Sequence, residues 1–248
     1  MPTVAAPATD PGRAHECFVR GRRLMRSFDI EGYEAATVEL IQAVQADPSS
    51  AAAYAALAET YSYWGFRREL NGEEHESFYA LALDSAGKAL ARAPKSAQAH
   101  RAMAVALRRG AAGDPERRKD EALAALDLDP NDAENWCEKW RAFGYDPDDA
   151  SIRRTLELDP ELCSAHIDLG VAYCEADRLA EALTEMVCAL KINPRNSLVH
   201  YDLAMVVYRQ GHRRAARELL ARALKARPND PLLKAGELLL RGDSHDAA

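Results

Sequence analysis

The sequence predicts an all-α solenoid built from stacked helix pairs. Six prolines divide the chain: Pro48, Pro94, Pro130, Pro160, Pro194 and Pro228. All of them except Pro160 have an alanine five residues earlier. The last two intervals are both 34 residues, a period typical of tandem helix pairs. Proline cannot continue a helix, so each alanine-to-proline stretch ends one pair and starts the next. The composition, with 48% hydrophobic residues and only 13 glycines, also suits a helical protein.

The overall charge and the cysteine content indicate which partners and which cellular compartment to expect. The net charge of -7 argues against nucleic acid as a partner, because phosphate binding needs concentrated Lys and Arg. Five cysteines without a C-x-x-C pattern indicate free thiols in a reducing compartment. We find no signal peptide and no run of 18 apolar residues, so we expect a cytoplasmic protein without membrane insertion.

The proline spacing gives the expected domain boundaries. Residues 1–12 read as a flexible leader, residues 13–241 as one repeat domain and residues 242–248 as a flexible tail. We expect six helix pairs and one closing helix, over residues 14–48, 51–94, 97–130, 133–160, 163–194, 197–228 and 231–241. The fourth pair is about four residues short, which predicts a shortened second helix over 149–158.

The fifth and sixth pairs carry the same residue types at the same spacing. Leu169, Gly170, Tyr173, Ala182, Met186, Ala189 and Pro194 correspond to Leu203, Ala204, Val207, Ala216, Leu220, Ala223 and Pro228. This pattern resembles the tetratricopeptide repeat family, and the resemblance covers residues 14–241. It implies a right-handed solenoid that acts as a protein-binding scaffold or adaptor. The first two pairs also loosely resemble the tetratricopeptide modules of bacterial adenylate cyclases and winged-helix regulators.

The resemblance places a peptide-binding groove along the first helix of each pair. The residues that it assigns to this groove are Arg22, Met25, Arg26, Glu59, Tyr63, Arg101, Arg108, Arg109, Arg141, Tyr201, Met205, Tyr208 and Arg209. Seven arginines make it basic, and arginine suits carboxylates because its planar fork donates two parallel hydrogen bonds. We therefore expect a partner peptide or helix with acidic residues at the arginine end and an apolar anchor near Tyr201 and Tyr208. The alternative is that these arginines form a solvated surface.

Other motifs do not predict catalysis, a metal or a cofactor. His100, His166 and His200 share one position of their repeats, and equivalent positions lie about 10 Å apart, too far for one metal ion. The acidic residues from Asp127 to Glu138 fail as a calcium loop, because Asp132 replaces the required glycine. No catalytic triad, nucleotide-binding loop or H-E-x-x-H motif is present, so we expect no enzyme.

Three irregular segments leave alternatives open. The insertion at 66–77 contains an Asn71-Gly72 turn signal and either lengthens the following helix from Glu73 or projects toward a ligand. Trp136, Trp140 and Phe143 of the fourth pair are either core or the lining of a small-molecule pocket. The closing helix holds five leucines, more than one buried stripe needs, which makes it a candidate homodimer contact.

Overall fold

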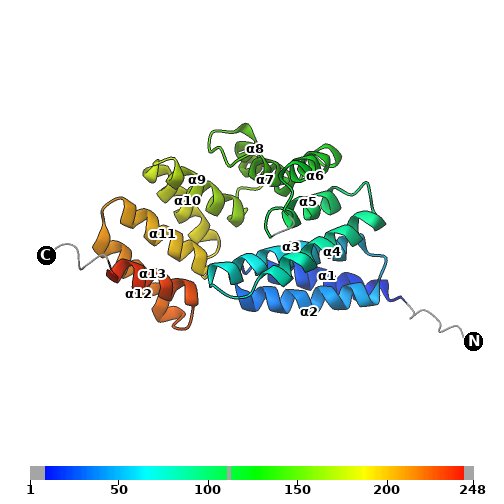
Figure 1. Cartoon of the computed structure of the whole chain (residues 1–248), viewed down its shortest axis with the longest axis horizontal. Helices are drawn as coiled ribbons and strands as arrows, with labels where there is room; N and C mark the ends of the chain where they lie inside the picture. The colour runs from blue at the N-terminus through cyan, green and yellow to red at the C-terminus, as the bar shows by residue number, and fades with distance from the viewer. Residues whose placement is uncertain (1–8, 111–112, 243–248) are drawn as a thin grey trace, which may run out of the picture. The chain divides into compact units, whose positions relative to one another are not determined.

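The computed structural model describes residues 9–110 and 113–242, and all regular structure in these ranges is helical. Figure 1 labels the thirteen helices found there. None of the described helices is long and apolar enough to cross a membrane. The chain divides into two compact units, the first up to Pro130 and the second from Asn131. The predicted leader and tail lie mostly outside the described residues, and α1 begins at Pro11.

The described part of the first unit holds three helix pairs. Its helices are α1 Pro11–Met25, α2 Ile30–Ala46, α3 Ala51–Leu70, α4 Glu76–Arg92, α5 Ala97–Ala106 and α6 Pro115–Leu128. Each first helix packs against its own second helix, and α3 also packs against α1, α2 and α5. The described helices therefore alternate as the proline rhythm predicts.

Polar side chains at the helix starts explain where these helices begin. The side chains of Asp29, Ser50, Ser96 and Asp114 each accept a hydrogen bond from the backbone amide three residues later. Such caps satisfy amides that have no partner inside the helix, and each contributes about 1 kcal/mol. Several of the prolines therefore lie between the end of one helix and the cap of the next.

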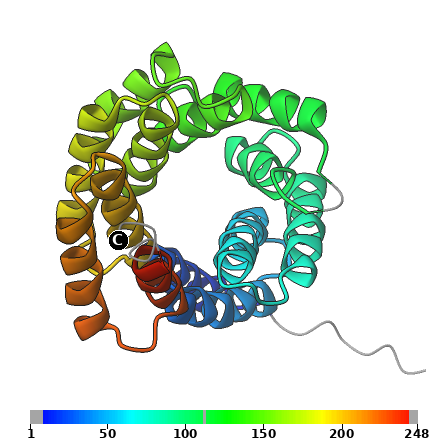
Figure 2. The same ribbon diagram turned by 60° about the vertical axis from the view of Figure 1, so that its left-hand side comes forward.

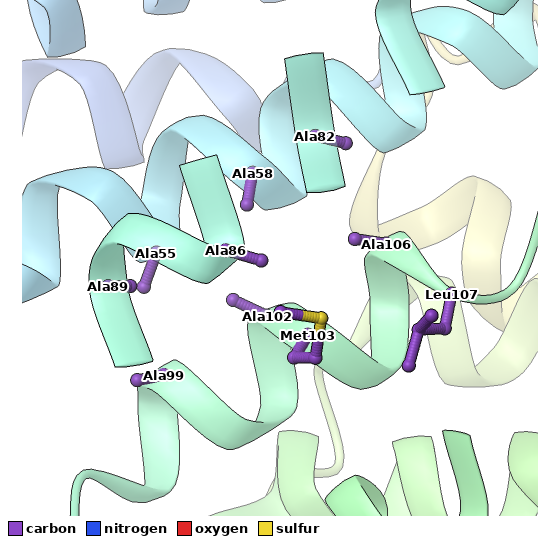
Figure 3. Close-up of a cluster of buried hydrophobic side chains, with 10 residues drawn as sticks. All are labelled: Ala55, Ala58, Ala82, Ala86, Ala89, Ala99, Ala102, Met103, Ala106 and Leu107. Atoms are coloured by element: carbon purple, nitrogen blue, oxygen red, sulfur yellow. The ribbon is translucent and has the colours of Figure 1, made fainter. Parts of the chain in front are cut away.

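Small side chains let the helices of a pair approach closely. Figure 3 shows the alanine-rich cluster between α3, α4 and α5, in which Ala58, Ala82, Ala86 and Ala102 are fully buried. Gly21 of α1 has the same role, because a Cβ there would lie 2.6 Å from the side chain of Leu40 on α2. Interiors are close-packed, so a larger residue at such a crossing forces the helices apart.

The insertion at 66–77 lengthens the preceding helix, and the expectation that it lengthens the following one from Glu73 is wrong. Helix α3 continues to Leu70, whereas α4 begins only at Glu76. The Asn71-Gly72 turn is present, with Gly72 at a φ of 70°, a conformation that glycine adopts without strain. Arg68 fastens the turn by donating to the carbonyl oxygen of Glu74 at 2.6 Å.

The described part of the second unit holds three further pairs and one last helix. Its helices are α7 Ala133–Ala142, α8 Ala150–Leu158, α9 Cys163–Glu175, α10 Leu179–Ile192, α11 Ser197–Arg209, α12 Arg213–Ala226 and α13 Pro231–Gly242. The second helix of the fourth pair is short, as the interval before Pro160 predicts. Figure 2 shows α13, in red, beside the orange α12, and α13 also packs against α11.

Candidate functional site

Three first helices of the first unit place their predicted groove residues together. We call this the α1–α3–α5 face and define it by Arg22, Met25, Arg26, Glu59, Tyr63, Phe66, Arg101, Arg108 and Arg109. Glu59, Tyr63 and Phe66 follow one another at helical spacing along α3. Side chains from α1, from α5 and from the turn that follows α5 contact this stripe.

Glu59 is the centre of the face because it binds an arginine from each neighbouring helix. Arg22 of α1 donates to its Oε2 at 2.7 Å, and Nε of Arg101 on α5 donates to its Oε1 at 3.0 Å. The side chains of Glu59 and Arg101 are each only 4% exposed. A buried charge pair of this kind fixes the register of the helices that carry it. Arg101, which the sequence assigns to the peptide-binding groove, is buried, and its guanidinium binds Glu59.

The other end of the face combines arginines with aromatic rings. The guanidinium of Arg109 lies 3.8 Å from the ring centre of Phe66, and that of Arg108 lies 5.7 Å from Tyr63. Tyr63 in turn stacks on Tyr33 at 6.4 Å, and burial raises the pKa of Tyr33 far above its usual range. A guanidinium near an aromatic ring is attracted electrostatically by the ring's quadrupole.

Arg109 and Arg108 remain partly exposed, unlike Arg101. The side chain of Arg109 is 32% exposed, and its Nη1 lies 3.4 Å from Oε2 of Glu69, which is itself exposed. Exposed pairs at such a distance contribute little and exchange partners readily. Arg26, one helical turn beyond Arg22, is also exposed. These three arginines are therefore partly or fully exposed, and the side chain of Arg22 is 25% exposed.

In the second unit the predicted arginines connect first helices to each other. Nε of Arg141 on α7 donates to Asp168 of α9 at 2.6 Å, and Arg141 is only 5% exposed. Arg209 of α11 donates to the carbonyl oxygen of Cys174 and, at 3.1 Å, to Asp177. Arg141, which the sequence assigns to the peptide-binding groove, is thus buried and joins α7 to α9.

The predicted apolar anchor of the second unit lies beneath the last helix. A Cβ at Gly236 of α13 would come within 2.9 Å of the Tyr201 ring, so α13 rests directly on that ring. Met205 and Tyr208 are half-buried against the same core, which includes Leu220 and Leu233. In the first unit Met25 likewise belongs to the core beside Leu40 and Leu57. The leucine-rich closing helix therefore occupies the place where the sequence predicts an anchor for a peptide.

Comparison with known proteins agrees with this architecture. Residues 175–237 match the tetratricopeptide repeat family, a stretch that runs from the end of α9 into α13. The chain has the tetratricopeptide-repeat fold. No curated protein sequence is significantly similar to it.

Solved structures share the tetratricopeptide-repeat fold over most of the chain at low sequence identity. The human IFIT1 dimer with m7Gppp-AAAA superposes with a TM-score of 0.70 at 17% identity over 85% of this chain, which spans about half (50%) of the IFIT1 chain. Pseudomonas aeruginosa pilF gives a TM-score of 0.53 at 17% identity, covering 94% of this chain and 99% of pilF. The APC/C hetero-tetramer Cut9-Hcn1 gives 0.62 at 12% identity, covering 92% and 46%.

The three repeat histidines make the same contact with the proline that ends the preceding pair. Nε2 of His100, His166 and His200 lies 2.9 to 3.0 Å from the carbonyl oxygen of Pro94, Pro160 and Pro194 respectively. Nδ1 of His100 and of His166 lies 2.6 Å from a glutamate on the second helix, Glu121 or Glu185. His100 and His166 therefore connect the end of the preceding pair to the second helix of their own pair. No group of three potential metal-ligating side chains converges within the described ranges.

The aromatic fourth repeat has a filled core. Trp140 is 1% exposed, packs with Cys137, Ile152 and Leu169, and donates from Nε1 to the carbonyl oxygen of Asp146 at 2.7 Å. Phe143 points outward and is 47% exposed. Trp140, the central residue of the alternative in which these aromatic side chains line a small-molecule pocket, is therefore a core residue.

Sequence reasoning missed the residues that hold the arginines in place. Phe66, Glu69, Asp168 and Asp177 contact predicted groove arginines, yet none was assigned to the groove. One signal was present in the chain: Arg22, Arg67 and Arg209 occupy the last turns of first helices. Positive charge there is favourable next to the helix dipole. That position explains part of the arginine pattern without a partner.

Proposed function

We propose that this tetratricopeptide-repeat chain is a protein-interaction scaffold whose α1–α3–α5 face binds an acidic segment of a partner protein. The observation that carries the proposal is the pair Arg108 and Arg109, which are partly exposed and whose guanidinium carbons lie 5.7 Å and 3.8 Å from the ring centres of Tyr63 and Phe66. A guanidinium that is already oriented loses less conformational freedom when it binds a carboxylate. The Cut9-Hcn1 assembly, in which a chain with this fold is part of a hetero-tetramer, supports a protein partner.

The buried pair at Glu59 has a separate role in this proposal. Arg22 and Arg101 hold α1, α3 and α5 in one register around Glu59, so the exposed end of the face is rigid. A rigid face binds an extended or helical segment with a smaller entropic cost. We accordingly assign contact with the partner to Arg26, Arg108 and Arg109, and we assign support of the face to Arg22, Glu59 and Arg101.

Fluorescence anisotropy with labelled peptides tests the proposal. The probes are glutamate-rich peptides that carry one aromatic residue, and matched peptides in which glutamine replaces every glutamate. We expect the acidic peptides alone to bind, and the double variant Arg108→Glu with Arg109→Glu to weaken binding at least about tenfold, or about 1.4 kcal/mol. Binding should also weaken as salt is added, because the contact is between exposed charges.

A matched double variant on α8 controls for the change in net charge. Arg153 and Arg154 are adjacent, exposed and on a second helix, so Arg153→Glu with Arg154→Glu should leave peptide binding unchanged. Equal binding of acidic peptides by both double variants would contradict the proposal. A single-stranded RNA oligonucleotide is the last probe, because arginines beside aromatic rings also bind nucleic acid. Tight RNA binding that the α5 variant abolishes, with no peptide binding, would replace the protein partner by RNA.

A further inference from the structure

The last helix continues the repeat register by one more first helix. Pro231 lies 34 residues after Ser197, the start of α11, and the buried positions coincide. Leu233 and Leu240 of α13 are 0% and 1% exposed, as are Val199 and Val206, which lie 34 residues earlier. Helix α13 also packs against the preceding second helix, α12, as a first helix does. It is therefore the first helix of a seventh pair.

The face of α13 that should meet a second helix is uncovered. In the six complete pairs the residue at this position is buried: Gly21, Ala58, Ala104, Trp140, Gly170 and Ala204. A Cβ at Gly170 would lie 2.8 Å from Met186 of the second helix, which shows what covers the position. Leu238 lies 34 residues after Ala204 and is 66% exposed. The described residues supply no helix to cover it.

Helix α13 also carries the residue pattern of a second helix. Three of the six described second helices have a small residue, then a larger residue four positions later, then a small residue after three more. This spacing holds in Ala36-Leu40-Ala43, Ala182-Met186-Ala189 and Ala216-Leu220-Ala223, and all nine residues are buried. The same spacing recurs in α13 as Ala235-Leu239-Gly242. Ala235 and Leu239 are exposed, so this pattern is not used within the described chain.

We infer that two copies of this chain pair through α13, each α13 serving as the second helix of the other copy. Both required surfaces lie on the same helix, and a surface that complements itself produces a closed two-fold dimer. Leu238 of one copy then packs against Leu239 of the other.

The charges around the leucines agree with an antiparallel arrangement. An antiparallel pair centred on Leu238 and Leu239 brings Lys234 of one copy to the C-terminal turn of the other α13. A lysine is favourable there because that end of the helix dipole is negative. Lys234 and Arg241 are exposed and flank the leucines, so the contact has an apolar centre and a polar rim.

The size of the contact predicts a weak dimer. Helix α13 has 12 residues and is about 18 Å long, so the pair buries less than a standard interface. Sedimentation velocity of the full chain over a concentration series should therefore show a reversible monomer–dimer equilibrium. A chain that remains monomeric throughout the series would overturn the inference. The exposed face of α13 would then be a site for a helix of another protein.

Charge variants of the two leucines test the contact itself. We expect Leu238→Glu with Leu239→Glu, and separately Leu238→Lys with Leu239→Lys, to be monomeric and to keep the wild-type circular dichroism spectrum. Mixing the two variants should restore a dimer, because opposite charges then meet across the two-fold axis. Dimers formed by either variant alone, or a mixture that stays monomeric, would contradict direct pairing of the helices.

Two controls separate this inference from the proposed function. Val38 on α2 is 52% exposed, so Val38→Glu removes an equally exposed apolar residue and should leave the dimer intact. The α5 variant Arg108→Glu with Arg109→Glu should also dimerise like the wild type, whatever it does to peptide binding. Loss of the dimer in either control would show that the contact lies in the first unit, which would overturn the inference.

Discussion

Arg101 donates from Nε to Oε1 of Glu59 at 3.0 Å, although 42 residues separate the two in sequence. Both side chains are almost completely buried, and Arg22 binds the second oxygen of the same carboxylate. One carboxylate thus connects the first helices of three consecutive repeats. Two arginines of the predicted groove, Arg22 and Arg101, thus join neighbouring first helices, while Arg108 and Arg109, just after α5, stay partly exposed.

Removing Glu59 should destabilise the chain strongly. Glu59→Ala leaves Arg101 buried beside Arg22 without the carboxylate that both bind, and such a loss costs about 3 kcal/mol. Urea unfolding followed by circular dichroism measures the change. Glu218 pairs with Arg214 on the surface, so Glu218→Ala is the control and should not alter the free energy of unfolding. Equal stability of the two variants would show that the buried pair contributes nothing.

The His166–Glu185 contact should make stability depend on pH. Burial acts to lower the pKa of His166, but the hydrogen bond to Glu185, the carbonyl of Pro160 and the charges of Glu185 and Asp159 outweigh it, so the pKa is raised. A raised pKa in the folded chain gives stability that is fully present below the unfolded value of about 6.5. This stability is lost as the pH rises through the folded pKa.

Comparing two histidine variants isolates this contribution. Thermal unfolding of the wild type should show the loss with rising pH, and His166→Gln should remove that part of the pH dependence. In the next pair, His200 occupies the position of His166, and Leu219 occupies the position of Glu185. His200→Gln is therefore the matched control and should keep the pH dependence of the wild type. An NMR titration of His166 with a midpoint below the unfolded value would refute the raised pKa.

A methyl group at Gly236 should loosen the last helix. The added Cβ would lie 2.9 Å from the Tyr201 ring and 3.2 Å from Leu220, so Gly236→Ala should cost about 1 to 3 kcal/mol through overpacking. Hydrogen exchange of α13 amides measures the effect. A Cβ at Gly87 of α4 meets nothing within 4 Å, so Gly87→Ala should instead stabilise its helix by about 0.5 to 1 kcal/mol. If both variants changed stability in the same direction, the close contact of Gly236 with Tyr201 would be contradicted.

Trp140 should act as a core residue. Trp140→Phe removes the donor to the carbonyl oxygen of Asp146 and leaves a void beside Ile152, which together cost about 2 kcal/mol. Denaturant unfolding measures this cost, with Phe143→Ala as an exposed control that changes stability by less than about 0.5 kcal/mol. A Trp140→Phe variant as stable as the wild type would reopen the alternative that this repeat holds a small-molecule pocket.

The sequence by itself determined the helix pairs, because the signals that set them are local. Asp29, Ser50 and Ser96 cap helices that start where the proline rhythm predicts, and Ala43 and Ala89 mark the crossings. The short second helix before Pro160 could also be predicted, since the interval leaves no room for a longer one. The Asn71-Gly72 turn was correctly placed. No local signal showed that the inserted residues extend α3 rather than α4.

Only the tertiary structure decided which arginines are buried in ion pairs and which stay partly exposed. Arg101 and Arg109 are alike in sequence, yet Arg101 meets Glu59 inside the stack and Arg109 lies on Phe66 at its edge. The difference depends on residues about 40 positions away in the chain, which periodicity cannot pair. For the same reason the five leucines of α13 look alike in sequence, while packing buries Leu233 and Leu240 and leaves Leu238 and Leu239 exposed. Local propensity sets where helices begin and end, and long-range packing sets which of their side chains remain available to bind.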